Sequence, residues 1–325
     1  MLRAILLALL SLLVLAGFNI AEVRAPNGLH VHNLNTGLNY TTIQQAINAP
    51  ETLNGHTILV DEGIYYEHVV ISKSVSLIGK NKTETIIDGT GLAVGTNAVD
   101  VYAPSVTISG FTIQNSQWVA INLENSYCTV NGNILRNCDD AVGQNNNNNN
   151  TISENTFENN TGRCIFLWRT YWNVAVNNVI SRSWEGIIVE GGGNLIGNNS
   201  IMQCTDIAIN TVGGVGGENN IIGNLVMNNS NGIGCTSGGC NVTANTVMHN
   251  GGGISLLNAY GSIVSGNVVS DNTGFGITTD ASAPLTFRQN NITKNKYNLY
   301  LGEFPSDYER INIDISNEID GKPVY

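Results

Sequence analysis

The sequence predicts an all-β fold, a right-handed parallel β-helix with about 22 residues and three short strands per coil. One observation is an asparagine that recurs at spacings of 21 to 25 residues, at Asn133, Asn155, Asn178, Asn199, Asn224, Asn245, Asn267 and Asn290. A second is that apolar residues stand at fixed offsets from each Asn, in three rows per repeat. A third is that each row lies in a short alternating run bounded by Gly, Asn or Ser, and none is long enough for a helix.

The chain begins with a basic residue, Arg3, followed by an apolar run from Ala4 to Ala16. This pattern predicts a signal peptide over residues 1–25 and a secreted, extracellular or periplasmic protein. An uncleaved anchor is the alternative, although the run is shorter than the ~20 residues of a spanning helix. No other segment of the sequence is apolar and long enough to enter a membrane.

The remaining residues, 26–325, are predicted to form one solenoid. Residues 26–57 form an N-terminal cap, in which Thr42–Asn48 is a short amphipathic helix that covers the open apolar end. Residues 58–110 form irregular first coils, 111–300 form regular coils with a stacked Asn ladder, and 301–325 begin a C-terminal segment that could be truncated. Gln144 and the six Asn residues after it predict a mobile polar loop.

The amino-acid composition limits the classes of partner that the protein is expected to bind. The chain has 14 Lys and Arg residues against 25 Asp and Glu, a net charge of −11, and no basic cluster. This charge excludes nucleic acid and anionic membrane surfaces as expected partners, and we expect a monomer. Cys235 and Cys240 could close a tight loop as a disulfide, whereas Cys164 is predicted to be a buried thiol.

The N-terminal run and the Asn-containing coils resemble NosD-like periplasmic copper-accessory proteins. They also resemble the wider class of carbohydrate-binding and sugar-hydrolase β-helices. The resemblance covers about residues 40–325. It implies the fold strongly, but members of these families share coils more than sites, so function has to be read from particular residues.

Stacked coils would bring side chains of successive repeats together on one face. The residues so aligned are Trp118, Glu124, Asp139, Asp140, Arg163, Trp168, Arg169, Trp184, Glu185 and Glu190. Flat aromatics beside carboxylates and guanidinium groups suit sugar rings, which have apolar faces and hydroxyl rims. We therefore predict a non-catalytic site for a polysaccharide or glycan surface. The alternative is that these are turn-packing aromatics and surface ion pairs.

An enzyme is the next alternative, as a glycoside hydrolase or polysaccharide lyase. Asp139 and Asp140 in the segment Cys-Asp-Asp-Ala-Val resemble one motif of the polygalacturonase family, which needs paired carboxylates. The other motifs of that family, Asn-Thr-Asp, Gly-His-Gly and Arg-Ile-Lys, are absent from the sequence.

Copper is the remaining alternative. Met202, Met227 and Met248 stand three residues after successive ladder Asn residues, and His249 follows the last. Because the residue before each Met is in an apolar row, the three thioethers should point outward and could hold soft Cu(I). Gap-filling Met is the competing interpretation. His30 and His32 form a second candidate chelating pair.

Overall fold

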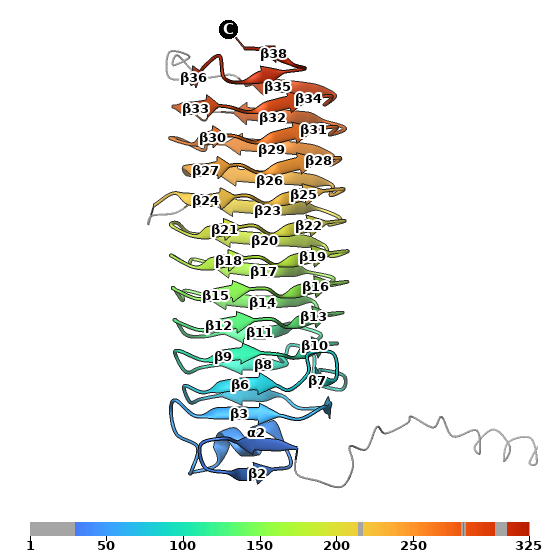
Figure 1. The fold of residues 1–325 in the computed structure, drawn as a ribbon, viewed down its shortest axis with the longest axis vertical. Coiled ribbons are helices and arrows are strands. Elements are labelled where there is room, and N and C mark those ends of the chain that lie inside the picture. The colour runs from blue at the N-terminus through green and yellow to red at the C-terminus, as the bar shows by residue number, and fades with distance from the viewer. Residues whose placement is uncertain (1–29, 214–216, 281, 283, 303–310, 325) are drawn as a thin grey trace, which may run out of the picture.

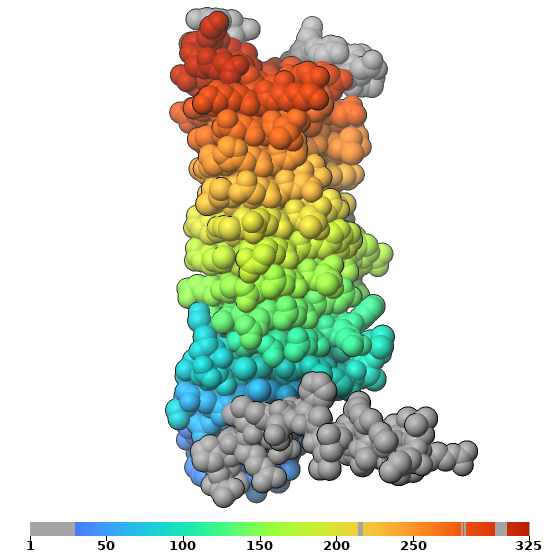
Figure 2. Space-filling model, turned by 90° about the vertical axis from the view of Figure 1, so that its right-hand side faces the viewer, coloured from blue at the N-terminus to red at the C-terminus, as the bar shows by residue number. Residues whose placement is uncertain are grey.

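The protein is an elongated rod of stacked coils (Figures 1 and 2). A computed structural model describes residues 30–213, 217–280, 282, 284–302 and 311–324. The chain makes about 11 turns of ~22 residues, and three parallel sheets run along the rod. The predicted β-helix with three strands per coil is confirmed. The predicted signal peptide, residues 1–25, lies outside the described residues.

Each regular coil contributes one strand to each sheet, and β1, β2 and β38 add antiparallel strands at the two ends of the rod. Sheet A holds β2 (Leu38–Tyr40), β1 (Val31–Asn33), β3 (Thr57–Val60), β6 (Ser76–Gly79), β9 (Thr107–Ser109), β12 (Thr129–Asn131), β15 (Thr151–Ser153), β18 (Val174–Val176), β21 (Leu195–Gly197), β24 (Asn219–Ile222), β27 (Cys240–Thr243), β30 (Ile263–Ser265), β33 (Leu285–Arg288) and β36 (Ile311–Ile313). Sheet B holds β4 (Gly63–Tyr65), β7 (Thr85–Asp88), β10 (Thr112–Gln114), β13 (Ile134–Arg136), β16 (Thr156–Glu158), β19 (Val179–Ser181), β22 (Ser200–Met202), β25 (Leu225–Met227), β28 (Thr246–Met248), β31 (Val268–Ser270), β34 (Asn291–Thr293), β37 (Glu318–Ile319) and β38 (Lys322–Pro323). Sheet C holds β5 (Val69–Ile71), β8 (Val99–Val101), β11 (Val119–Leu123), β14 (Asp140–Asn145), β17 (Arg163–Trp168), β20 (Glu185–Glu190), β23 (Ile207–Val212), β26 (Asn231–Thr236), β29 (Gly252–Leu257), β32 (Phe275–Asp280) and β35 (Tyr297–Leu301).

The core is a continuous apolar column inside the three sheets. In sheet B, Leu135 pairs with Phe157 and Phe157 with Ile180, and all three are fully buried. The three predicted apolar rows thus fall one on each sheet, pointing inward. Register is firmly specified because a slip of one residue would turn every inward side chain outward.

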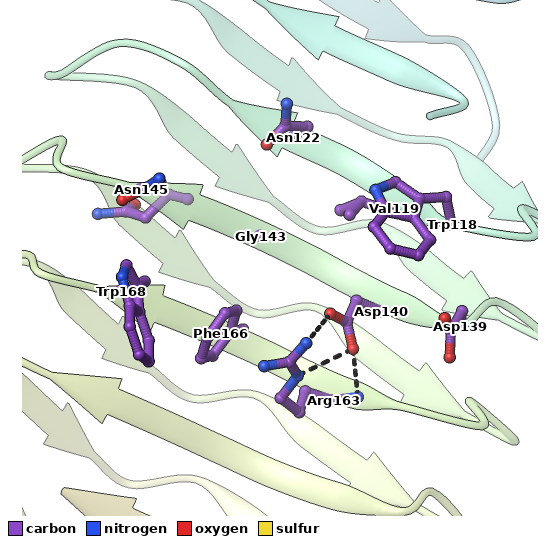
Figure 3. Close-up of a pocket in the computed structure, with 11 residues that line it drawn as sticks. Trp118, Val119, Asn122, Asp139, Asp140, Gly143, Asn145, Arg163, Phe166 and Trp168 are labelled. Atoms are coloured by element: carbon purple, nitrogen blue, oxygen red, sulfur yellow. Dashed lines mark hydrogen bonds and ion pairs between the residues drawn. The ribbon is translucent and has the colours of Figure 1, made fainter. Parts of the chain in front are cut away.

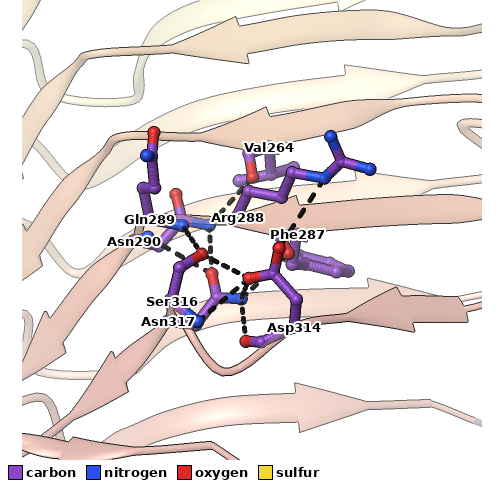
Figure 4. Close-up of polar contacts among 8 residues, drawn as sticks. All are labelled: Val264, Phe287, Arg288, Gln289, Asn290, Asp314, Ser316 and Asn317. Atoms are coloured by element: carbon purple, nitrogen blue, oxygen red, sulfur yellow. Dashed lines mark hydrogen bonds and ion pairs between the residues drawn. The ribbon is translucent and has the colours of Figure 1, made fainter.

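The predicted Asn ladder occupies the turn between sheets A and B. Asn199 accepts at Oδ1 from the backbone N–H and side-chain Nδ2 of Asn178, both at 3.0 Å. Its own Nδ2 donates to the carbonyl of Ala175 at 2.9 Å. The last rung is Asn290 on Asn317, which Figure 4 shows beside Asp314 and Ser316. The buried polar groups of each turn therefore find their hydrogen-bond partners in adjacent coils, as buried backbone groups must.

Two further ladders, which were not predicted from the sequence, occupy the other two turns. Asn229, Asn250 and Asn272 repeat the pattern between sheets B and C. Asn150, Asn173 and Asn194 do so between sheets C and A. The prediction of a mobile loop after Gln144 was wrong, since Gln144 and Asn150 are buried and bonded to each other at 3.0 Å.

Residues just before the ladder positions adopt left-handed backbone. Asn159, Asn198 and Asn228 have φ values of 55°, 53° and 58°. Asn tolerates this conformation better than other residues with a Cβ. Each is followed by a ladder Asn and then by Ser or Thr, so an Asn-x-Ser/Thr pattern recurs at these exposed positions.

The N-terminal cap contains helix α2 (Ile43–Asn48), as predicted. Thr42 caps it by accepting from the backbone N–H of Gln45 at 3.1 Å. Both carboxylate oxygens of Glu67, from the coils, accept from the N–H groups of Ile43 and Gln44 at 3.0 Å. Ile43, Ala46 and Ile47 are fully buried against the end of the column.

At the C-terminal end, β36 extends sheet A, and β37 pairs with β38 as an antiparallel hairpin on sheet B. Cys235 and Cys240 are disulfide-bonded, as the spacing indicated. Cys164 is a buried free thiol, and burial raises its pKa to about 12. Among the described residues, none of the helices has the length and hydropathy to cross a membrane.

Candidate functional site

A groove of about 430 Å³ opens on the outer face of sheet C, over β11, β14 and β17 (Figure 3). It is lined by Trp118, Val119, Asn122, Asp139, Asp140, Gly143, Gln144, Asn145, Arg163, Phe166 and Trp168. Five of the predicted site residues are therefore brought together, from three successive coils. Trp118 and Trp168 lie at opposite ends of the groove, with Gly143 between them.

The floor of the groove exists because Gly143 has no side chain. Gly143 pairs with Asn122 on one side and with Phe166 on the other. A Cβ at Gly143 would lie 3.2 Å from the Val119 side chain and would begin to fill the groove. Phe166 and Trp168 form one wall, with ring centroids 5.6 Å apart.

Arg163 and Asp140 form a tight ion pair beside this wall. The backbone N–H and Nε of Arg163 donate to Asp140 Oδ1 at 2.7 and 3.1 Å, and Nη2 donates to Oδ2 at 2.6 Å. The guanidinium also lies 3.6 Å from the centroid of the Phe166 ring. These contacts hold the side chains rigid and present a flat cationic and aromatic surface to the groove.

Asp139 lies next to this pair and is less engaged. Its Oδ1 accepts one weak hydrogen bond, from Thr161 Oγ1 at 3.4 Å. Both carboxylates crowd Gly162, where a Cβ would approach Asp140 Oδ1 to 2.5 Å and Asp139 Oδ1 to 2.9 Å. Asp139 is thus the acceptor that remains available to a ligand hydroxyl.

The other five predicted residues do not line the groove. Glu124 accepts from Asn122 at 2.9 Å. Arg169 pairs with Glu190 at 3.8 Å where β17 and β20 end. Glu185 lies opposite Arg163 in the next coil, where burial and the charge of Asp206 raise its pKa. Trp184 is exposed one residue earlier.

Six lining residues were not among the predicted site residues, and three of these six are Asn122, Gly143 and Phe166. These three share one outward row, immediately after the third apolar row. Their residue types differ, so no repeated letter marks the row. The available signal was positional, since a glycine between two larger residues in an outward row indicates a notch.

The Met row lies on the outer face of sheet B. Met202 pairs in register with Met227, and Met227 pairs with Met248. All three are partly exposed, and His249 follows in a left-handed turn with φ 57°. The strands that carry these residues are about 4.8 Å apart. Thioether sulfur is a ligand type that Cu(I) prefers.

The second candidate pair is His30 and His32. His32 bonds Asn39 through Nδ1 at 2.7 Å and Asp61 through Nε2 at 2.9 Å, so both ring nitrogens are engaged. Within the described residues, no group of three or more His, Cys, Asp or Glu side chains is arranged to hold a metal.

Two family models match the chain. Residues 93–246 match the right handed beta helix region, and residues 209–319 match the periplasmic copper-binding protein NosD. The second match covers Met227, Met248 and His249.

A curated relative is the cell surface glycoprotein of Methanothermus fervidus, 32% identical over 221 residues. The match covers 64% of this chain but 31% of the glycoprotein, so the chain spans about a third of that relative's length. A surface protein and a periplasmic family both support an extracytoplasmic location.

Solved structures share the fold at low identity. The tailspike protein of E. coli bacteriophage HK620, in complex with a pentasaccharide, has a TM-score of 0.65 and 10% identity, covering 93% of this chain and 73% of its own. The PL6 polysaccharide lyase Pedsa3628 from Pseudopedobacter saltans has a TM-score of 0.54 and 15% identity, covering 84% and 92%. The A-module of mannuronan C-5 epimerase AlgE6 from Azotobacter vinelandii has a TM-score of 0.53 and 13% identity, covering 85% and 94%.

These likenesses agree with the observed fold. The chain is a right-handed parallel β-helix, in which residues 93–246 are similar to the right handed beta helix region and residues 209–319 are similar to NosD.

Proposed function

We propose that this protein binds a carbohydrate chain, without reacting with it, in the groove on the outer face of sheet C. The observation that carries the proposal is the combination of Trp118, Phe166 and Trp168 with fixed polar groups in one open groove. Aromatic rings contact the apolar faces of sugars, while Asn122, Asn145 and Asp139 offer amide and carboxylate partners to hydroxyls.

The comparisons support this proposal at a coarser level. The tailspike with the same fold was solved with a pentasaccharide. The curated relative is a cell-surface glycoprotein, which fits a secreted or surface-attached role directed by the predicted signal peptide. A glycan surface or a soluble polysaccharide would then meet the exposed groove outside the cytoplasm.

Catalysis at the Asp pair is less well supported. A general base has to be free to take a proton, and Asp140 is instead held by three hydrogen bonds from Arg163. Reducing-sugar and unsaturated-product assays on acidic polysaccharides test this directly. Product that disappears in Asp140→Asn would contradict the non-catalytic role.

Binding is tested by applying the labelled protein to a glycan array that includes neutral and acidic polysaccharides. We expect retention on at least one polysaccharide and loss of retention in Trp168→Ala. An array with no retained glycan for the parent protein would overturn the proposal.

Copper binding by the Met row is a second candidate function. It is favoured by the register of Met202, Met227 and Met248. The NosD match also covers Met227 and Met248, although Met202 lies outside it. If Cu(I) binds there, the three thioethers would be its ligands and His249 a neighbouring imidazole. This surface lies on sheet B, so it would act independently of the groove on sheet C.

A further inference from the structure

A second groove, of about 450 Å³, opens on the same outer face of sheet C, over β23, β26, β29 and β32. Its floor is made by glycines at outward positions. Gly234 stands between Asn210 and Ser255 in register, and Gly252 pairs with Asn231. Neighbouring coils carry side chains at these positions, so the absence of two side chains produces the hollow.

Aromatic rings close one end of the second groove. Phe275 lines the groove and stacks with Tyr297 and Tyr300 at centroid distances of 5.0 and 5.2 Å. All three rings are exposed by more than a third. The groove therefore has the same parts as the first one, namely a glycine floor and an aromatic wall.

The lining of the second groove contains no charged residue. Its polar residues are Asn210, Asn231, Thr236, Ser255 and Thr278, and the other lining residues are glycine or apolar. Amides and hydroxyls supply hydrogen bonds, but nothing there neutralises an anion. A desolvated carboxylate without a partner is strongly unfavourable, so an uncharged polyhydroxylated ligand fits best.

The charges around the first groove also favour an uncharged ligand. Its one lining cation, Arg163, is already paired with Asp140, while Asp139 is available, and the whole chain carries a net charge of −11. An acidic polysaccharide would meet carboxylates without a free guanidinium to bind it.

The two grooves lie in line along the rod. Only β20 separates β17, which lines the first groove, from β23, which lines the second. Gly143 and Gly234 are four coil steps apart in one row, through Phe166, Ile188 and Asn210. Four steps correspond to about 19 Å.

We infer that the second groove is a further subsite for the same ligand, and that this ligand is an extended, uncharged glycan lying along sheet C across both grooves. This inference rests on the proposed function, because it assigns the class of carbohydrate and its direction. Binding should strengthen once an oligosaccharide is long enough to span the two glycine floors.

The test uses the full chain in affinity electrophoresis through gels that hold a neutral mannan, a neutral glucan or alginate. Gly252→Leu fills the second groove, since a Cβ there would meet only the movable end of Asn231 at 3.3 Å. Gly197→Leu is the matched control, because Gly197 is an outward strand position on sheet A with an ordinary Cβ contact of 3.4 Å. Phe275→Ala removes the wall and serves as a second variant if Gly252→Leu does not fold.

We expect a neutral polysaccharide to retard the parent and Gly197→Leu equally, and to bind Gly252→Leu or Phe275→Ala about tenfold more weakly. A disaccharide of the same sugar should bind all four proteins alike. If both groove variants keep full affinity for the long chain, or alginate retards the parent more than the neutral gels, this inference is wrong while the proposed function stands. If no gel retards the parent, the proposed function fails and this inference with it.

Discussion

Arg163 holds Asp140 through three hydrogen bonds at 2.7, 3.1 and 2.6 Å, one from its own backbone and two from its guanidinium. The pair links β17 to β14 across the coils and keeps the aromatic wall of the first groove in place. It also distinguishes the two adjacent Asp residues that line the groove: Asp140 is held in the ion pair, whereas Asp139 keeps acceptor capacity for a ligand.

Removing the guanidinium should destabilise the rod. Arg163→Ala leaves Asp140 buried with only a backbone donor, and we expect a loss of about 2 kcal/mol in the free energy of unfolding. Urea unfolding followed by circular dichroism measures it. Arg182→Ala is the control, because its 3.0 Å pair with Glu158 is exposed and should contribute about 0.5 kcal/mol. Equal losses in the two variants would contradict a structural role for the Arg163 pair.

The Asn ladder should carry more stability than any surface contact. Asn199→Ala removes the acceptor used by two Asn178 donors and the donor used by the Ala175 carbonyl, all in a buried turn. Unsatisfied buried groups predict a loss of about 3 kcal/mol or more. The unfolding midpoint in urea reports it.

Asn210→Ala, in the same coil, is the matched control for that variant. Asn210 points outward from β23 and has no side-chain hydrogen bond within the described part of the chain. We expect a change within about 0.5 kcal/mol. A ladder variant as stable as this control would show that the stacked amides are dispensable.

Much of the fold and part of the site could be predicted from the sequence. The reason is that residues separated by one repeat length become neighbours in adjacent coils when the strands pair in register. The offsets from each Asn placed the core rows, the Met row, and Asp140 beside Arg163. The ladder between sheets B and C was not predicted because its equivalent positions are not all asparagine. Asn160 is followed there by Ser183 and Cys204 in the next two coils. Gly143 and Phe166 were missed because a notch depends on which neighbouring side chain is small, and no residue type repeats in that row.

Stability should fall as the pH rises through neutrality. Hydrogen bonds to Asp61 and Asn39 raise the pKa of His32 above its ordinary value. The contribution of protonated His32 is therefore complete below about pH 6.5 and is lost as the pH rises through the higher folded-state pKa. Burial alone would raise the pKa of Asp61, but hydrogen bonds from His32 and Lys80 outweigh it and lower that pKa. The stability that Asp61 contributes is therefore lost only at acid pH.

Thermal midpoints between pH 5 and pH 9 measure this effect. The thermal midpoint of the parent should decrease over the upper part of that range. In His32→Gln this slope of midpoint against pH should be smaller, because the contribution of His32 is missing. His249→Gln, at an exposed turn, should keep the slope of the parent. A slope that survives unchanged in His32→Gln would exclude this histidine as its source.

The Met row predicts a Cu(I) site that a conservative change removes. Met227 is the middle residue, paired with Met202 and Met248, so Met227→Leu keeps the volume but loses the central sulfur. We expect at least about a tenfold drop in Cu(I) affinity in competition with bicinchoninate under reducing conditions. Ser270→Ala, the next position in the row, should match the parent. The same affinity in all three proteins would mean that the sulfurs only fill space.

The most direct measurement for the groove on sheet C is the affinity of paired tryptophan variants for a polysaccharide retained on the array. Trp168 lines the groove, whereas Trp172 is 56% exposed on the adjoining turn and does not line it. We predict that Trp168→Ala weakens binding about tenfold, by loss of ring stacking, and that Trp172→Ala binds like the parent. Equal affinities for the parent and both variants would contradict carbohydrate recognition in this groove.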